Sequence, residues 1–121
     1  MTTTEYQKAA HEFADYTEPT IVDSWNLQKG TEIPYVYPAM GLAEEAGEVL
    51  GKFAKAVRDE RGVISPERKL AIIGELGDCC WFIAELATLL GVSLEAVMEG
   101  NINKLKSRRE RGKIHGSGDE R

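Results

Sequence analysis

The stretch GLAEEAGEVLGKFAK, residues 41–55, decides the fold that this sequence predicts. Its apolar side chains recur every three or four residues, which is the period of a helix with one apolar face. The same stretch carries three glutamates, Glu44, Glu45 and Glu48, within five positions. A helix that is apolar on one side and acidic on another is therefore predicted. The apolar positions, continued to the end of the helix, are Leu42, Ala46, Val49, Leu50, Phe53 and Val57.

Three further segments predict helices. Residues 4–16 place apolar side chains at helical spacing. Ser65, followed by proline and glutamate, is typical of a helix start, and the helix that it begins is expected to end at Gly91. Ser93 caps a fourth helix that fades near Gly112. Four helices with no convincing strand predict an all-α, four-helix-bundle-like fold.

A chain of 121 residues suits one hydrophobic core, so residues 1–121 are expected to form a single domain. Residues 1–36 would supply an N-terminal helix and loop, and residues 112–121 a polar, glycine-rich tail. The segment CCWFIAELATLL, residues 79–90, is apolar almost all round. Because a short chain has little material to cover such a helix, a subunit interface and hence a homo-oligomer are predicted.

Composition narrows the class of protein. The formal net charge is −5, which argues against a general nucleic-acid binder. No apolar run approaches the roughly 20 residues of a membrane-spanning helix, and residues 1–13 lack the apolar region of a signal peptide. The cysteines, Cys79 and Cys80, are adjacent and poorly placed to bridge each other. A cytoplasmic protein with no membrane or nucleic-acid partner is expected.

Two acidic pairs predict the functional site. Residues three apart on a helix are neighbours, so Glu45 projects with Glu48, and Glu75 projects with Asp78. Each pair borders an apolar face, where two packed helices would bring the pairs together. Carboxylates that crowd each other favour a neutralising cation, and oxygen ligands suit Mg²⁺ or Mn²⁺. Solvated acidic faces on surface helices account for the same spacing, so both interpretations stay open.

Two observations bear on the kind of site. Ferritin-like di-iron bundles need Glu-x-x-His, whereas neither His11 nor His115 lies three residues after a glutamate. This argues against redox chemistry. Glycine inside a helix costs about 1 kcal/mol relative to alanine, so internal glycines call for an explanation. Close approach of helices or room for a ligand is the expected reason at Gly47, Gly51, Gly74 and Gly77.

The fourth helix is basic. Residues 101–113, NINKLKSRRERGK, set six cations against one acid. Asn101, Lys104 and Arg108 are spaced at i, i+3 and i+7, and Asn101 and Arg108 project to the same side as Leu105. Polar groups that face inward need partners, and phosphate oxygens next to a metal site would supply them. Cations that merely favour a helix C-terminus, or that contact RNA, are the alternatives.

With these motifs in hand, the chain resembles the MazG-like all-α nucleoside triphosphate pyrophosphohydrolases. The family pattern is E-E-x-x-E followed by E-x-x-D on the next helix, which here is EEAGE at residues 44–48 and ELGD at residues 75–78. The surrounding blocks YPAMGLAEEAGEV, ELGDCCWFIAELA, NINKLKSRRERG and HGSGDER agree with a small single-domain branch. The resemblance covers residues 35–121, and the N-terminal third matches only loosely.

The resemblance implies an enzyme that cleaves a nucleoside triphosphate, ribo or deoxy, to the monophosphate and pyrophosphate with Mg²⁺. Such an activity has a nucleotide-pool or house-cleaning role. Glu45 would act in catalysis as a metal ligand, and Glu44 would orient or deprotonate the attacking water. The complete set of metal ligands implied is Glu45, Glu48, Glu75 and Asp78.

The resemblance also implies the groups that bind the substrate. Asn101, Lys104 and Arg108 would contact its phosphates, and Lys52, on the acidic side of the second helix, would also reach them. Trp25 is a stacking residue for the base or else an anchor of the core. Family members are dimers or tetramers, which implies a homodimer or homotetramer here.

Two rival functions remain open at this point. A non-enzymatic helical interaction module would keep the same fold and leave the acids on its surface. A related pyrophosphohydrolase would act on phosphoribosyl-ATP or on a modified nucleotide. Release of pyrophosphate that depends on Mg²⁺ separates the module from the enzymes, and a panel of substrates separates the enzymes from each other.

Overall fold

The computed structural model describes residues 1–16 and 35–118. These residues form four helices and no strand, which confirms the predicted all-α class. The helices are α1 (Thr3–His11), α2 (Val36–Glu60), α3 (Pro66–Leu89) and α4 (Leu94–Glu110).

Side-chain caps fix the starts of three helices. The Ser65 side chain accepts a hydrogen bond from the Arg68 backbone N–H at 3.2 Å, and Pro66 occupies the first turn of α3. Ser93 accepts from the Ala96 N–H at 3.1 Å at the start of α4. These two caps confirm the predicted starts. Thr2 caps α1 in a reciprocal arrangement with Glu5.

The first helix is shorter than predicted. It ends at His11, and the chain continues in turns closed by bonds from the Phe13 N–H to the Ala10 carbonyl and from the Ala14 N–H to the His11 carbonyl. Phe13, expected on the apolar face, is 75% exposed because the helical period is lost before it. The turns let Tyr16 reach α3, where its hydroxyl donates to Glu85.

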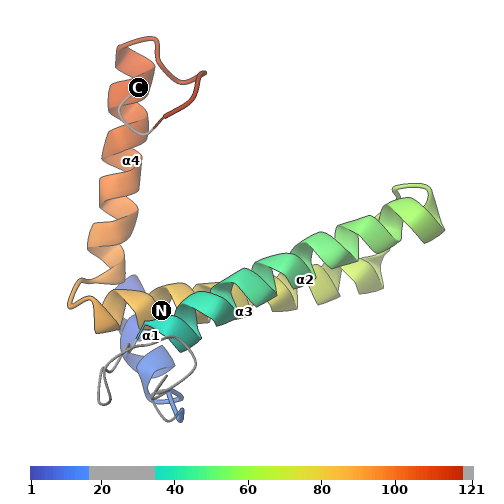
Figure 1. Ribbon diagram of the computed structural model, residues 1–121, viewed down its shortest axis with the longest axis horizontal. Coiled ribbons are helices and arrows are strands. Elements are labelled where there is room, and N and C mark those ends of the chain that lie inside the picture. Colours follow the sequence, from blue (N-terminus) through green and yellow to red (C-terminus); the bar gives the residue numbers. More distant parts are fainter. Residues whose placement is uncertain (17–34, 119–121) are drawn as a thin grey trace, which may run out of the picture.

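The helices form a hairpin with an arm. Figure 1 shows α2 and α3 side by side, and α4 projecting away from one end of this pair. The bend between α3 and α4 is 102°. Within the described ranges, α4 contacts α1 and α3 but not α2. The basic helix therefore leaves the α2–α3 hairpin of its own chain instead of packing along it.

The core lies where α1, α3 and α4 meet. Ala10, Ala84 and Leu94 are buried there, with Tyr6 and Trp81 packed against them. The Trp81 indole N–H donates to the Ala10 carbonyl at 3.0 Å, so the polar end of the largest side chain in this cluster has a hydrogen-bond partner. Most of the hairpin lies beyond this core and is covered on one side only.

Glycine matters most at a position that the sequence did not single out. A Cβ atom at Gly41 would lie 2.2 Å from the Phe82 ring, so α2 and α3 approach closely there. At the four internal glycines for which close helix approach or room for a ligand was predicted, an added Cβ atom would meet no described neighbour within 4 Å, so close approach within one chain is not the reason. Gly62 follows the left-handed Arg61 and has φ 81°, a conformation suited to the end of a helix such as α2.

No single helix in the described part of the chain is long and apolar enough to cross a membrane. Only α3 and α4 taken together across their bend meet the length and composition of a span.

Candidate metal centre

The acidic pairs meet on the α2–α3 hairpin. Glu45 lies on α2, and Glu75 and Asp78 lie one turn apart on α3. Carboxylate oxygens of these three residues all lie within 4.8 Å of one another. Glu45 and Glu75 are half-buried and Asp78 is exposed, so the cluster opens to solvent on one side. The structure thus brings together three of the four predicted metal ligands.

The remaining two predicted acids lie beside this cluster. Glu48, the fourth predicted ligand, has a side chain that is 53% exposed, and its Oε2 atom lies 3.6 Å from the Lys52 ammonium. Glu44 is exposed on α2, next to Glu45. Glu48 shares a helix face with Glu45 because the two are three residues apart, whereas Glu44 directly precedes Glu45 and projects in a different direction.

The electrostatics of the cluster fit a site for a cation. Burial, with further contributions from the Asp78 and Glu75 charges, raises the pKa of Glu45. Burial and the nearby Glu45 charge also raise the pKa of the Cys79 thiol. Negative charge therefore accumulates here without full compensation. All the donors are carboxylate oxygens, which suit a hard divalent ion such as Mg²⁺ or Mn²⁺.

Lys52 lies among the carboxylates. Its Nζ atom is 2.9 Å from Glu75 Oε1, and the hydrogen bond from Lys52 lowers the pKa of Glu75. The sequence predicted a phosphate contact for Lys52, and the structure places this side chain as a partner of two predicted metal ligands, Glu75 and Glu48. The phosphate contact stays a prediction.

The basic trio of α4 is not brought to the carboxylates within one chain. Asn101 and Lys104 are exposed, whereas Arg108 is 6% exposed. Leu105, on the side that was predicted to face inward, is 41% exposed, so in one chain Asn101 and Lys104 do not face the carboxylates, and the predicted phosphate contacts of the trio stay a prediction. The reason is the bend before α4, which carries all but the first turn of this helix away from the hairpin. Trp25 lies outside the described residues, so its predicted stacking role stays a prediction.

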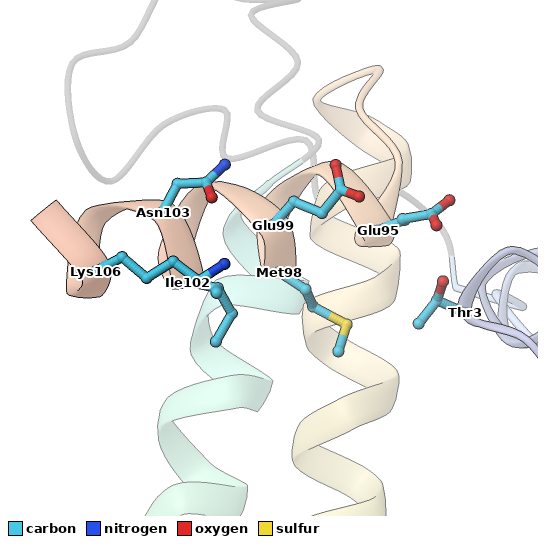
Figure 2. A pocket seen from close by; sticks show the side chains of 7 residues that line it. All are labelled: Thr3, Glu95, Met98, Glu99, Ile102, Asn103 and Lys106. Atoms are coloured by element: carbon cyan, nitrogen blue, oxygen red, sulfur yellow. The ribbon is translucent and has the colours of Figure 1, made fainter.

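A separate groove of about 500 Å³ runs along α4. Figure 2 shows its apolar side chains, Met98 and Ile102, pointing from α4 toward the side where the hairpin lies. Among the residues that the structure describes, no predicted site residue lines this groove. Its lining is Thr3, Glu95, Met98, Glu99, Ile102, Asn103 and Lys106.

The sequence analysis missed a buried carboxylate at the α1–α3 contact. Glu85 is 1% exposed, and its oxygens accept a hydrogen bond from the Tyr16 hydroxyl at 2.8 Å and lie 3.0 Å from His11 Nδ1. A signal for it exists, since Glu85 is the only charged residue in the apolar run 79–90. A lone acid within a buried segment predicts a polar partner, here supplied by α1 and the turn after it.

Comparisons with known proteins agree with this geometry. Residues 39–112 match the MazG nucleotide pyrophosphohydrolase domain. The "Gene 37 protein" of Mycobacterium phage L5 is 49% identical over 85 residues, which cover 70% of this chain and 75% of that protein. The "Uncharacterized protein YvdC" of Bacillus subtilis (strain 168) is 42% identical over 78 residues, 57% of this chain and 70% of that protein. No solved structure matches. Because the matched domain spans more than half of the sequence, the chain belongs to the MazG nucleotide pyrophosphohydrolase family.

Proposed function

We propose that the protein hydrolyses a nucleoside triphosphate, ribo or deoxy, to the nucleoside monophosphate and pyrophosphate with Mg²⁺. The observation that carries this proposal is the convergence of the Glu45, Glu75 and Asp78 oxygens within 4.8 Å on the hairpin of a MazG-family chain. Mn²⁺ is the expected substitute for Mg²⁺, since it accepts the same oxygen ligands. We place this nucleotide-pool activity in the cytoplasm, because the adjacent Cys79 and Cys80 are poorly placed to form a disulfide.

In this proposal, different residues of the hairpin bind the metal ion and activate the attacking water. Glu45, Glu75 and Asp78 would hold the ion, and Glu48 would join them from the same face of α2. The ion, when bound, polarises phosphate oxygens and lowers the pKa of a bound water. Glu44 orients the attacking water or takes its proton as oxygen bonds to phosphorus and the bond between the α and β phosphates breaks.

Apolar side chains support a homo-oligomer. At about 100° per residue, Leu50, Phe53 and Val57 share one side of α2, and the acidic residues lie on another. A matching stripe runs along α3. These side chains are 37–70% exposed in one chain, which is a large apolar surface for a soluble monomer. The residues of this hairpin stripe are Leu50, Phe53, Val57, Ile73, Leu76 and Ile83.

A second copy also gives the basic helix a place to bind. Val97, Met98, Ile102 and Leu105 are each at least 41% exposed on α4, and Met98 and Ile102 line the groove in Figure 2. The C-terminal half of α4 is positive, whereas the hairpin of the neighbouring subunit offers carboxylates. In a dimer or tetramer, the exposed Asn101 and Lys104 would reach phosphates held at that neighbour's metal centre, whereas Arg108, buried in its own chain, would first have to turn outward.

A pyrophosphate-release screen tests the activity. The protein is incubated with the common ribo- and deoxyribonucleoside triphosphates and with phosphoribosyl-ATP, with Mg²⁺ or with EDTA. Monophosphate plus pyrophosphate is expected from at least one triphosphate, only with the ion present. Diphosphate plus orthophosphate would contradict the proposed bond cleavage, and absence of any product would favour an interaction module.

The Asp78→Asn variant ties the activity to the cluster. It is expected to lower pyrophosphate release by about 100-fold or more, because the amide is a weaker ligand and carries no charge. Helix content in circular dichroism should stay unchanged, since Asp78 is exposed. Asp59→Asn is the matched control, because Asp59 lies on the same hairpin and pairs with Arg58. Loss of folding in Asp78→Asn would show that the cluster is structural.

A further inference from the structure

Lys52 lies beside the carboxylate cluster and pairs with one of its three members, Glu75, and with the neighbouring Glu48. Its ammonium lies 2.9 Å from Glu75 on α3 and 3.6 Å from Glu48 on α2. The Lys52 side chain is 23% exposed and the Glu75 side chain 18% exposed. An ion pair that is partly withdrawn from water is screened less than one on the open surface. Lys52 thus joins the two helices through groups that are also predicted metal ligands.

The backbone beneath Lys52 is held independently of its side chain. Arg68 Nη1 donates to the Lys52 carbonyl at 3.2 Å, and Arg68 Nε donates to Glu60 at 3.1 Å. These bonds fix this turn of α2 against α3. The Lys52 ammonium, in contrast, sits at the end of a flexible four-carbon stem. It can leave Glu75 by a change of rotamer without moving either helix.

A divalent ion at the cluster and the Lys52 ammonium compete for the same oxygens. Two cations a few ångströms apart repel each other, and for a dication this changes an affinity by about tenfold even at the dielectric constant of water. We propose that Lys52 is the internal counter-ion of this metal centre: it holds Glu48 and Glu75 while no metal is bound, and it releases Glu75 to the metal. This inference rests on the proposed function, since it takes the cluster to be a metal centre.

The proposal predicts opposite effects on two measurable quantities. Without metal, loss of the Lys52 charge leaves neighbouring carboxylates uncompensated and lowers the melting temperature. With metal, the same loss removes a competitor and tightens metal binding. A lysine that only orients the ligands would instead weaken metal binding when it is removed.

Calorimetric titration of the 121-residue chain with Mn²⁺, without nucleotide, provides the first test. Lys52→Met keeps most of the side-chain stem and is expected to bind Mn²⁺ about tenfold more tightly than the wild type. Lys52→Gln should also bind Mn²⁺ more tightly than the wild type. Lys52→Arg should keep a Mn²⁺ affinity close to that of the wild type, because it keeps the positive charge. Lys55→Met is the matched control, since it removes a lysine one turn along α2, and it should leave the affinity unchanged.

Thermal unfolding provides the second test. In EDTA, Lys52→Met should melt below the wild type, and saturating Mn²⁺ should remove the difference. Unchanged or weaker Mn²⁺ binding by Lys52→Met and Lys52→Gln, or no Mn²⁺ binding by any variant, overturns the proposal. Tighter Mn²⁺ binding in a protein that releases no pyrophosphate would support the role of Lys52 and contradict the proposed activity.

Discussion

Gly41 sits where α2 passes the Phe82 ring of α3, and the absence of a side chain there lets the two helices meet. Phe82 is itself buried and makes an edge contact with Trp81, with ring centroids 4.8 Å apart. The ring therefore has little room to move aside. The packing of this end of the hairpin, and with it the relative position of the two acidic pairs, depends on one small residue.

Gly41→Ala is accordingly expected to destabilise the protein. The new methyl group would meet the Phe82 ring at 2.2 Å, and overpacking of this kind costs about 1–3 kcal/mol, more than the roughly 1 kcal/mol that alanine contributes through helix propensity. Gly47→Ala, on the same helix with nothing within 4 Å, should be neutral or stabilising. Urea unfolding followed by circular dichroism measures both variants. If Gly41→Ala were as stable as Gly47→Ala, the Phe82 ring would have to move aside to make room for the new methyl group.

At the scale of single residues, spacing predicts which side chains share a face but not what each one touches. The i, i+3 pairs and the apolar stripes made a meeting of the two acidic pairs one of two open interpretations, and Glu45, Glu75 and Asp78 do meet. The partners of Lys52 and Glu85 were not predicted, because an ion pair or a buried carboxylate depends on side chains that arrive from another helix.

At the scale of elements, Arg68 ties the two helices of the hairpin together near the turn that joins them. Its guanidinium pairs with Glu60 at the end of α2 and donates to the carbonyl of Lys52, which lies about two helical turns before Glu60. The Arg68 side chain is 16% exposed and the Glu60 side chain 33% exposed. This bidentate geometry favours the charged form of Glu60, and the hydrogen bond from Arg68 lowers the pKa of Glu60.

The stability that Glu60 contributes is therefore expected to depend on pH. Because the pKa of Glu60 is lower in the folded protein than its ordinary value of about 4.3, the contribution is complete above that value and is lost as pH falls through the folded pKa. Glu60→Gln should melt a few degrees below the wild type at pH 7, and the gap should close in strong acid. Melting curves from pH 7 down to acid measure this gap. A constant gap would assign the effect to packing.

The same scale shows why the sequence predicted the helices better than their arrangement. Caps at Ser65 and Ser93 are local signals, and both are confirmed. The direction of α4 depends on residues 90–93, where Gln7 of α1 accepts from the Leu94 N–H at 2.7 Å and donates to the Val92 carbonyl at 2.9 Å. A glutamine of α1 that bonds backbone groups of the α3–α4 connection and of the first residue of α4 has no sequence signature.

At the scale of the whole molecule, two kinds of surface are exposed among residues 1–16 and 35–118 of one chain. The hairpin stripe of six apolar residues lies beside an acidic face, and α4 carries its own exposed apolar residues beside a basic face. Four helices of one chain do not cover these faces, because α4 points away from the hairpin. Association of copies buries apolar surface and sets opposite charges near each other, so assembly and the metal centre are expected to be linked.

Leu76→Asp tests this link. Leu76 is 49% exposed in one chain and central in the hairpin stripe, so in an oligomer the new carboxylate would be buried without a partner. Such burial costs about 3 kcal/mol or more, which weakens a dissociation constant by more than about 100-fold. Sedimentation equilibrium should show a monomer for Leu76→Asp and a dimer or tetramer for the wild type and for Lys55→Asp, in which the new acid lies on the other side of the hairpin.

Because the monomer keeps Glu45, Glu75 and Asp78 on its own hairpin but lacks a neighbour's basic α4, it should still bind Mn²⁺ while losing affinity for nucleotide. Equal loss of metal and nucleotide binding would mean that the carboxylates themselves require the second copy.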